Sequence, residues 1–354
     1  MTPVMTAAGT LAAPFPYFGG KSGACALAWA LMGQPANYVE AFAGSAAMLL
    51  GRPNAPGIET INDFDGFVAN FWRAIAADPN AVAHHADWPC NEADLFARHS
   101  WLARQKDALV EALHDPEYFD AKIAGWWCWG ACNWIGSGWC QGAGPWVWDG
   151  ERIINTRQLP HLGNSGQGIN RKLPHLGDAG KGIVNKLPRL SGFSGIGINR
   201  GTGEQDRGAF IADWFSHLHA RLRNVRVACG DWSRVLKDSV TIRHGVTGVF
   251  LDPPYDKGSM DYGAGGMGQG ISAQVRAWCA ANGENTSLRI VLCGHAGEHD
   301  ELLGIGWTQH KWAARKGYAL TDEAIGNSAS ETVWASPHCI GQFKAQTDMF
   351  GEAA

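Results

Sequence analysis

The distribution of apolar and polar residues over the first 80 positions alternates between strand and helix patterns. Residues 37–42 (NYVEAF) have the pattern of a strand, and residues 43–50 (AGSAAMLL) turn and enter a helix. A second strand pattern, 57–62 (GIETIN), precedes a helical segment over 63–76. The apolar side chains that share one face of this helix are Val68, Phe71, Trp72 and Ile75. This β-α-β-α order predicts a parallel sheet.

The same alternation returns after residue 205. Residues 206–222 (DRGAFIADWFSHLHARL) have helical spacing. Short strand patterns follow as VRVACGD, VTGVFLD, LRIVLCG, GWTQHKWAA and ETVWAS. We therefore expect residues 10–80 and 206–354 to form one α/β domain around a single sheet, interrupted by an inserted domain at 81–205.

The predicted insertion has a different character. It begins with a polar helical stretch at 91–113 and continues into 125–148, which holds seven of the 17 tryptophans of the chain. A repeat of about 14 residues follows, as QLPHLGNSGQGINR, KLPHLGDAGKGIVN and KLPRLSGFSGIGINR. Because these units are too short and too rich in glycine to bury a core, we expect them to form an extended or looping surface segment.

A stiff turn follows the strand pattern that ends at residue 251. In VFLDPPYDKG an acid, two prolines and a tyrosine come directly after apolar, β-branched residues. Consecutive prolines exclude a helix and further ladder pairing, so Asp252 and Tyr255 are held where the strand ends. Ligands of open α/β sheets bind at the carboxyl ends of strands. Taken alone, the stretch fits a rigid turn with a capping Asp equally well.

A glycine turn after the first strand is a second candidate binding site. Glu40 ends that strand, and Gly44 allows a ligand to approach the backbone near a helix N-terminus. Asp63 ends the second strand, where an acid suits the hydroxyls of a ribose; the alternative is an N-cap for the next helix. Since the chain lacks GxxxxGK[ST] and this turn, with its single glycine, lacks the full GxGxxG, we expect a nucleoside ligand without a pyrophosphate, which argues against NAD and ATP.

Composition limits the class of protein. The 354 residues are 45% hydrophobic and 18% charged, which predicts a globular chain. No apolar run reaches the length of about 18 residues that a membrane span needs, and the first 20 residues hold no Lys or Arg of a secretory signal. Nine scattered cysteines indicate a reducing, cytoplasmic location. Cys128, Cys132 and Cys140 lack a zinc-site spacing, so we expect no metal.

Charge is distributed unevenly along the chain. The net charge is −4, yet residues 150–226 hold 12 Lys and Arg against 5 Asp and Glu. A basic segment in an otherwise acidic protein indicates phosphate contacts, as in nucleic-acid binding. A solvated basic loop is the alternative interpretation.

Five segments occur in an order that is known from one family. They are YFGGK (17–21), EAFAGSA (40–46), INDFD (61–65), ACGDW (228–232) and DPPY (252–255). Together they resemble the Dam-like, D12 class of S-adenosylmethionine-dependent DNA adenine-N6 methyltransferases. The resemblance covers about residues 14–80 and 224–336, and DPPY is its most specific segment. Ala41 and Ala46 depart from the Pro and Gly that are usual in the family.

The resemblance implies a Rossmann-like methyltransferase sheet with an inserted target recognition domain, S-adenosylmethionine as cofactor and double-stranded DNA as partner. The Asp252 carboxylate and the Pro253 carbonyl would accept the hydrogens of adenine N6, and Tyr255 would stack on the extruded base. Lys21 would join this catalytic set and, with Tyr17, line the pocket for cofactor and target. The remaining cofactor contacts that it implies are Glu40, Phe42 and Gly44 at the methionine moiety, Asp63 at the ribose, and Asp231 and Trp232 at the adenine.

Two further expectations concern DNA. The basic residues of the insertion that we expect to contact phosphates are Arg157, Arg171, Lys172, Lys181, Lys186, Arg189 and Arg200. Trp139 lies in a glycine-rich stretch where the family has a segment that inserts into DNA, so it is the candidate to fill the space left by the extruded base. The alternative is that the tryptophans of this segment pack internally.

Other functions stay open from the sequence. Cytosine N4 is an exocyclic amine that the same acceptors could serve, although DPPY with a tyrosine favours adenine. A DNA-binding protein without catalysis is a different class, against which the presence of Lys21, Asp63, Asp252 and Tyr255 argues.

Overall fold

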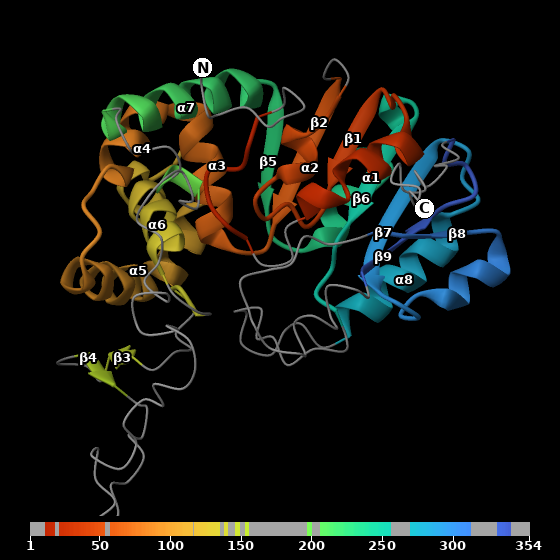
Figure 1. The fold of residues 1–354 in the computed structure, drawn as a ribbon. Helices are drawn as coiled ribbons and strands as arrows, with labels where there is room; N and C mark the ends of the chain where they lie inside the picture. The colour runs from red at the N-terminus through yellow and green to blue at the C-terminus, as the bar shows by residue number, and fades with distance from the viewer. Residues whose placement is uncertain are drawn as a thin grey trace, which may run out of the picture.

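A computed structural model describes most of the chain outside the repeat segment (Figure 1). The described residues are 11–17, 21–53, 57–115, 117–134, 138–140, 146–148, 153–155, 197–199, 206–255, 270–312 and 331–340. The 14-residue repeats, apart from residues 197–199, and the stretch 256–269 therefore lie outside them.

Seven strands form one mixed, mostly parallel sheet. They are β1 (Asn37–Glu40), β2 (Ile58–Asp63), β5 (Val225–Cys229), β6 (Thr247–Leu251), β7 (Leu288–His295), β8 (Thr308–Lys311) and β9 (Glu331–Ala335). Their order across the sheet is β5-β2-β1-β6-β7-β9-β8, and β9 runs antiparallel to both of its neighbours. The five parallel strands, numbered along the chain, thus follow the order 3-2-1-4-5 of doubly wound nucleotide-binding sheets. The predicted α/β class and parallel sheet are confirmed, and the topology is compatible with a Rossmann-like fold.

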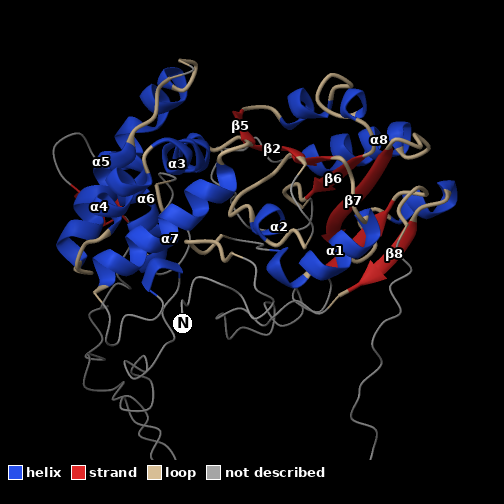
Figure 2. Ribbon diagram, turned by 90° about the horizontal axis from the view of Figure 1, so that it is seen from above, coloured by secondary structure: helices blue, strands red, loops and turns tan. Residues whose placement is uncertain are grey.

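The central strands are buried on both faces, which explains their continuous apolar patterns. Every residue of β1 and β6 is buried. Alternate side chains enter two separate hydrophobic clusters, so that Tyr38 and Phe250 lie on one side of the sheet and Val39 and Val249 on the other. Helices cover both sides: α1 (Cys25–Met32) and α2 (Ala47–Leu50) lie on one, and α8 (Ile271–Asn282) lies on the other (Figure 2).

Five helices gather beyond the β5 edge of the sheet (Figure 1). They are α3 (Gly66–Ala77), α4 (Pro79–Ala86), α5 (Glu92–Ala112), α6 (Ala121–Asn133) and α7 (Arg207–Leu222). The Phe71 ring of α3 lies 6.0 Å from that of Trp127 in α6 and 5.9 Å from that of Phe215 in α7. Helices from the predicted insertion therefore share a hydrophobic cluster with helices from the predicted catalytic domain.

Short elements complete the described chain. The strands β3 (Trp146–Trp148) and β4 (Ile153–Asn155) pair antiparallel. The 3₁₀ turns are η1 (Lys21–Gly23), η4 (Gly197–Asn199), η5 (Trp232–Leu236), η6 (Ile242–His244) and η7 (Asp300–Ile305). Within the described ranges, no helix is both long enough and apolar enough to span a bilayer.

The predicted helix over 63–76 is present as α3, and its apolar face is buried as expected. Its N-cap is Asp65, whose side chain accepts a hydrogen bond of 2.8 Å from the Phe67 N–H. The alternative interpretation of Asp63 as the N-cap is therefore wrong, because the chain continues for two residues between the end of β2 and the first turn.

Candidate active site

The candidate site lies where the strand order reverses, at the carboxyl ends of β1 and β6. These two strands are neighbours, and Glu40 pairs with Phe250 in register. The strand that follows β1 in the chain, β2, lies beside β1, whereas the strand that follows β6, β7, lies on the other side, beside β6. The segments after Glu40 and after Leu251 therefore leave the sheet at the same edge. This topological switch point is where doubly wound sheets bind their ligands.

A buried ammonium group shared by two carboxylates dominates this edge. Lys21 Nζ lies 3.2 Å from Asp252 Oδ1 and 3.3 Å from Glu331 Oε2, and the Lys21 side chain is only 4% exposed. The Tyr255 hydroxyl lies 3.1 Å from the same Asp252 oxygen and 3.2 Å from the same Glu331 oxygen. The structure thus brings together three predicted residues, Lys21, Asp252 and Tyr255, and adds Glu331.

The charges in this cluster are strongly coupled. Burial raises the pKa of Asp252, and the Glu331 carboxylate raises it further, while Lys21 and the Tyr255 hydroxyl oppose the shift. Burial alone would lower the pKa of Lys21, but attraction to Asp252 and Glu331 outweighs it and leaves that pKa above its ordinary value. Lys21 is therefore a permanent cation, and its charge favours the ionised form of Asp252.

Two aromatic contacts orient Tyr255. Its ring lies 4.5 Å from the His295 ring in an edge-to-face arrangement, and Lys21 Nζ lies 5.0 Å from its centroid. Pro253, between the acid and the tyrosine in sequence, is buried. The Pro-Pro turn and these contacts hold the tyrosine beside the carboxylate.

Glu331 is the site residue that the sequence analysis missed. It begins β9, and because β9 is antiparallel its first residue lies at the edge where the parallel strands end; it pairs with His295, the last residue of β7. The only local signal is an acid at the start of the ETVWAS strand pattern. Its place in the site depends on the strand direction.

A second group of predicted residues surrounds the turn after β1. Asp63 Oδ2 accepts a hydrogen bond of 2.8 Å from the Gly44 N–H, and Oδ1 accepts one of 2.9 Å from Asp65. Burial raises the pKa of Asp63 to about 7. Gly44 has a φ of +47°, and a Cβ there would lie 2.5 Å from the Tyr17 ring, so both the backbone conformation and the close approach of Tyr17 favour glycine.

Aromatic residues follow the ends of the neighbouring strands. The rings of Phe42 and Trp232 stack at 6.1 Å with an interplanar angle of 26°. Asp231 precedes Trp232 and caps η5 by accepting a 2.9 Å hydrogen bond from the Ser233 N–H. Since Gly230 donates to the Asp63 carbonyl, these residues lie on the strand end next to Asp63.

Glu40 is enclosed by protein. Its Oε2 accepts hydrogen bonds of 3.0 Å from the Tyr38 hydroxyl and 3.1 Å from the Leu49 N–H, and the residue is 2% exposed. Burial raises its pKa to about 8. In this arrangement Glu40 anchors α2 to β1, and therefore shapes the turn that contains Gly44.

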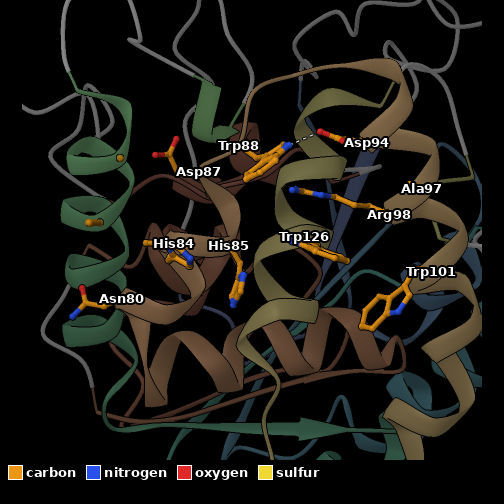
Figure 3. A pocket seen from close by; sticks show the side chains of 13 residues that line it. Asn80, His84, His85, Asp87, Trp88, Asp94, Ala97, Arg98, Trp101 and Trp126 are labelled. Atoms are coloured by element: carbon orange, nitrogen blue, oxygen red, sulfur yellow. Dashed lines mark hydrogen bonds between the residues drawn. The ribbon is translucent and has the colours of Figure 1, made fainter.

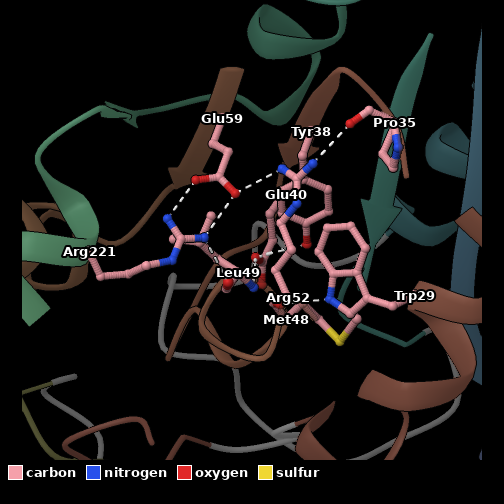
Figure 4. Close-up of polar contacts among 9 residues, drawn as sticks. All are labelled: Trp29, Pro35, Tyr38, Glu40, Met48, Leu49, Arg52, Glu59 and Arg221. Carbon is pink, nitrogen blue, oxygen red and sulfur yellow. Dashed lines mark hydrogen bonds and ion pairs between the residues drawn. The ribbon is translucent and has the colours of Figure 1, made fainter. Parts of the chain in front are cut away.

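A buried ion network extends this anchor to α7 (Figure 4). Glu59 of β2 receives hydrogen bonds from Arg52 at 2.9 Å and from the two terminal nitrogens of Arg221 at 2.6 and 2.8 Å. Arg221 also donates to the Leu49 carbonyl at 3.0 Å. Both acids thus fix the backbone of Leu49. Glu40 binds its N–H directly, and Glu59 holds its carbonyl through Arg221.

The structure does not describe the basic residues that we expect to contact DNA phosphates. Arg157, Arg171, Lys172, Lys181, Lys186, Arg189 and Arg200 lie outside the described residues.

Trp139 packs inside the helical layer. Its indole N–H donates 3.0 Å to the Trp127 carbonyl, and its ring lies 5.3 Å from that of Trp134 and 5.5 Å from that of His99. A Cβ at Gly130 would lie 1.8 Å from the Trp139 ring. Trp139 is half-buried, and a glycine of α6 makes room for its ring, so its contacts agree with the alternative that this tryptophan packs internally. Its role at an extruded base stays a prediction.

No protein-family model and no curated protein matches this sequence. In the part of the chain that the structure describes, no group of three or more His, Cys, Asp or Glu residues has the geometry of a metal site.

Proposed function

We propose that the protein transfers a methyl group from S-adenosylmethionine to N6 of an adenine in DNA. The observation that carries the proposal is the partly buried Asp252 carboxylate at the end of β6, held beside Tyr255 and Lys21 at the switch point of the sheet. The resemblance of DPPY and its companion segments to the Dam-like methyltransferases supports the same activity.

The residues around Gly44 fit a nucleoside cofactor. Asp63 ends β2 beside the Gly44 turn, which is the place of the ribose-binding acid in doubly wound folds. The half-buried Phe42 ring, which stacks on the buried Trp232, offers a flat apolar surface to an adenine.

Bound S-adenosylmethionine would supply an activated methyl group on its sulfonium. The task of the protein is then to make adenine N6 nucleophilic, since its lone pair is delocalised into the ring. An ionised Asp252 and the Pro253 carbonyl would accept hydrogen bonds from the two N6–H groups and favour the tetrahedral amine. The bond from the sulfonium to the methyl group would break as the N6–methyl bond forms, and Asp252 would take the proton that N6 then loses. Pro253 cannot relax into a helix or a ladder, so its carbonyl stays fixed, and preorganised acceptors of this kind lower barriers effectively.

Lys21 would keep Asp252 in the form that the reaction needs. A protonated Asp252 would offer one acceptor fewer, and burial favours that neutral form. The ammonium at 3.2 Å opposes this effect. Tyr255 would present its ring to an extruded base while its hydroxyl stays bonded to Asp252.

The product nucleoside tests the proposal. DNA from cells that express the protein should contain N6-methyladenine when its nucleosides are separated and identified by mass. DNA from cells that express the Asp252→Ala variant should lack it, and this variant should still bind S-adenosylmethionine in calorimetry. N4-methylcytosine in place of N6-methyladenine would contradict the adenine assignment. The absence of both, together with no binding of S-adenosylmethionine, would contradict the methyltransferase proposal as a whole.

A further inference from the structure

A pocket of about 910 Å³ lies within the helical layer (Figure 3). Its walls come from α4, α5, α6, α7 and the link between α4 and α5. It is therefore formed by other elements than the cluster around Asp252, and the proposed methyl transfer does not explain it.

Arg98 of α5 is the central polar group of this pocket. The residue is 7% exposed, and its guanidinium carbon lies 4.8, 4.7 and 4.4 Å from the rings of Trp88, Trp126 and Trp129. In Figure 3 the guanidinium reaches from α5 into the space between Trp88 and Trp126. Its buried Nη1 has no hydrogen-bond acceptor among the described residues. Because an unsatisfied buried donor is unfavourable, this group is suited to an acceptor supplied by a ligand.

The other walls of the pocket are flat and aromatic. The Trp101 and Trp126 rings meet edge to face at 5.3 Å, and Trp88 is 44% exposed. The Trp88 indole N–H donates to Asp94 at 2.5 Å, which fixes the orientation of that ring. Planar walls of this kind favour a planar ligand.

The pocket also contains carboxylates. Asp94 and Asp87 line it together with Arg98. Carboxylates beside the cation disfavour an isolated phosphate, which prefers several cations. They suit a ring whose edge carries both hydrogen-bond acceptors and donors.

We propose that this pocket binds a nucleobase. The ring would stack on an indole, one acceptor on its edge would bind Arg98, and a donor would face Asp94 or Asp87. Guanine is the best match among the bases, because O6 and N7 are adjacent acceptors that suit an arginine. The base could belong to a DNA strand or to a free nucleotide, and the chemistry of recognition is the same. The proposal stands independently of methyl transfer.

Calorimetric titrations with the four nucleoside monophosphates and with a guanine-containing single-stranded oligonucleotide test this site. Ala97→Trp would fill the pocket from its exposed rim, whereas Ala93→Trp adds the same side chain to an exposed position of α5 outside the pocket lining. Arg98→Met removes the guanidinium. We expect Ala97→Trp and Arg98→Met each to weaken binding about tenfold or more, and Ala93→Trp to leave it unchanged.

The two sources of the base give different results. If a mononucleotide binds, a free nucleotide is sufficient to occupy the pocket. If only the oligonucleotide binds, the pocket recognises a base within a strand. No binding of any of these probes to the unaltered protein would overturn the proposal, and so would full binding by a folded Ala97→Trp variant. Should Arg98→Met fail to fold, the Ala97→Trp and Ala93→Trp pair still decides the question.

Discussion

The Lys21 ammonium and the Glu331 carboxylate lie 3.3 Å apart, although Lys21 precedes β1 and Glu331 begins β9, the last described strand along the chain. The antiparallel direction of β9 produces this contact, because it brings the start of that strand to the edge where the parallel strands end. Asp252 and Glu331 therefore share one cation, and the ionisation of Asp252 depends on both partners.

Replacement of Glu331 should extend activity to lower pH. The negative charge of Glu331 raises the pKa of Asp252, so Glu331→Gln lowers that pKa. If methyl transfer needs ionised Asp252, the acid limb of the rate profile should move to lower pH, while the rate near neutrality changes by less than about tenfold. The profile of methylation rate against pH measures this shift. The exposed Glu284→Gln is the matched control, and an acid limb that stays in place or moves upward would contradict the coupling.

The site could be predicted from the sequence where its residues follow strand ends. Asp252, Tyr255 and Gly44 are each recognisable from a strand pattern that stops at a proline or glycine, and the parallel sheet then brings their segments together. Glu331 could not be predicted in this way, because its position depends on the direction of a strand whose pairing partner is distant in sequence. The internal position of Trp139 depends equally on a distant feature, the absence of a side chain at Gly130.

Loss of Lys21 should have the opposite effect to loss of Glu331. Lys21→Met leaves the partly buried carboxylates of Asp252 and Glu331 without their common cation, which raises the pKa of Asp252. We expect the acid limb of the rate profile to move upward and the stability to fall by about 3 kcal/mol, as for a broken buried ion pair. Denaturant unfolding and the rate profile measure the two effects. The exposed Lys237→Met should change neither; a Lys21→Met variant with unaltered stability and profile would show that the cation is dispensable.

Asp63 should act on cofactor affinity. Asp63→Asn keeps an acceptor for the Gly44 N–H but removes the carboxylate that would hold the ribose. We expect the affinity for S-adenosylmethionine, measured by calorimetry, to fall about tenfold or more, as when a charged hydrogen bond is lost. An unchanged affinity would remove Asp63 from the ribose role. The exposed Asp238→Asn is a control for the loss of a charge.

Glu40 should make the stability of the fold depend on pH. Burial raises its pKa to about 8 from an ordinary 4.5, so the folded state holds a proton that the unfolded chain releases. Its contribution to stability is complete below about pH 4.5 and is lost as the pH rises to about 8, by at most about 1.4 kcal/mol per pH unit. Glu40→Gln should therefore reduce this decline in urea unfolding between pH 5 and 8. Equal slopes for the variant and the unaltered protein would show that Glu40 does not titrate in this range.

Trp139 should contribute to stability. Its ring packs against Trp134 and His99, and its indole N–H is bonded to the Trp127 carbonyl, so Trp139→Ala removes these contacts and leaves a cavity. Since the ring is only half-buried, we expect unfolding to require about 2 kcal/mol less free energy, which is below the loss for a tryptophan removed from a core. Phe64→Ala, at a residue that is 54% exposed, should change it much less. Methylation by folded Trp139→Ala should then be reduced equally on duplex DNA and on DNA whose target adenine is mismatched. A variant of normal stability that is about tenfold slower on the duplex alone would return Trp139 to the role of filling the space left by an extruded base.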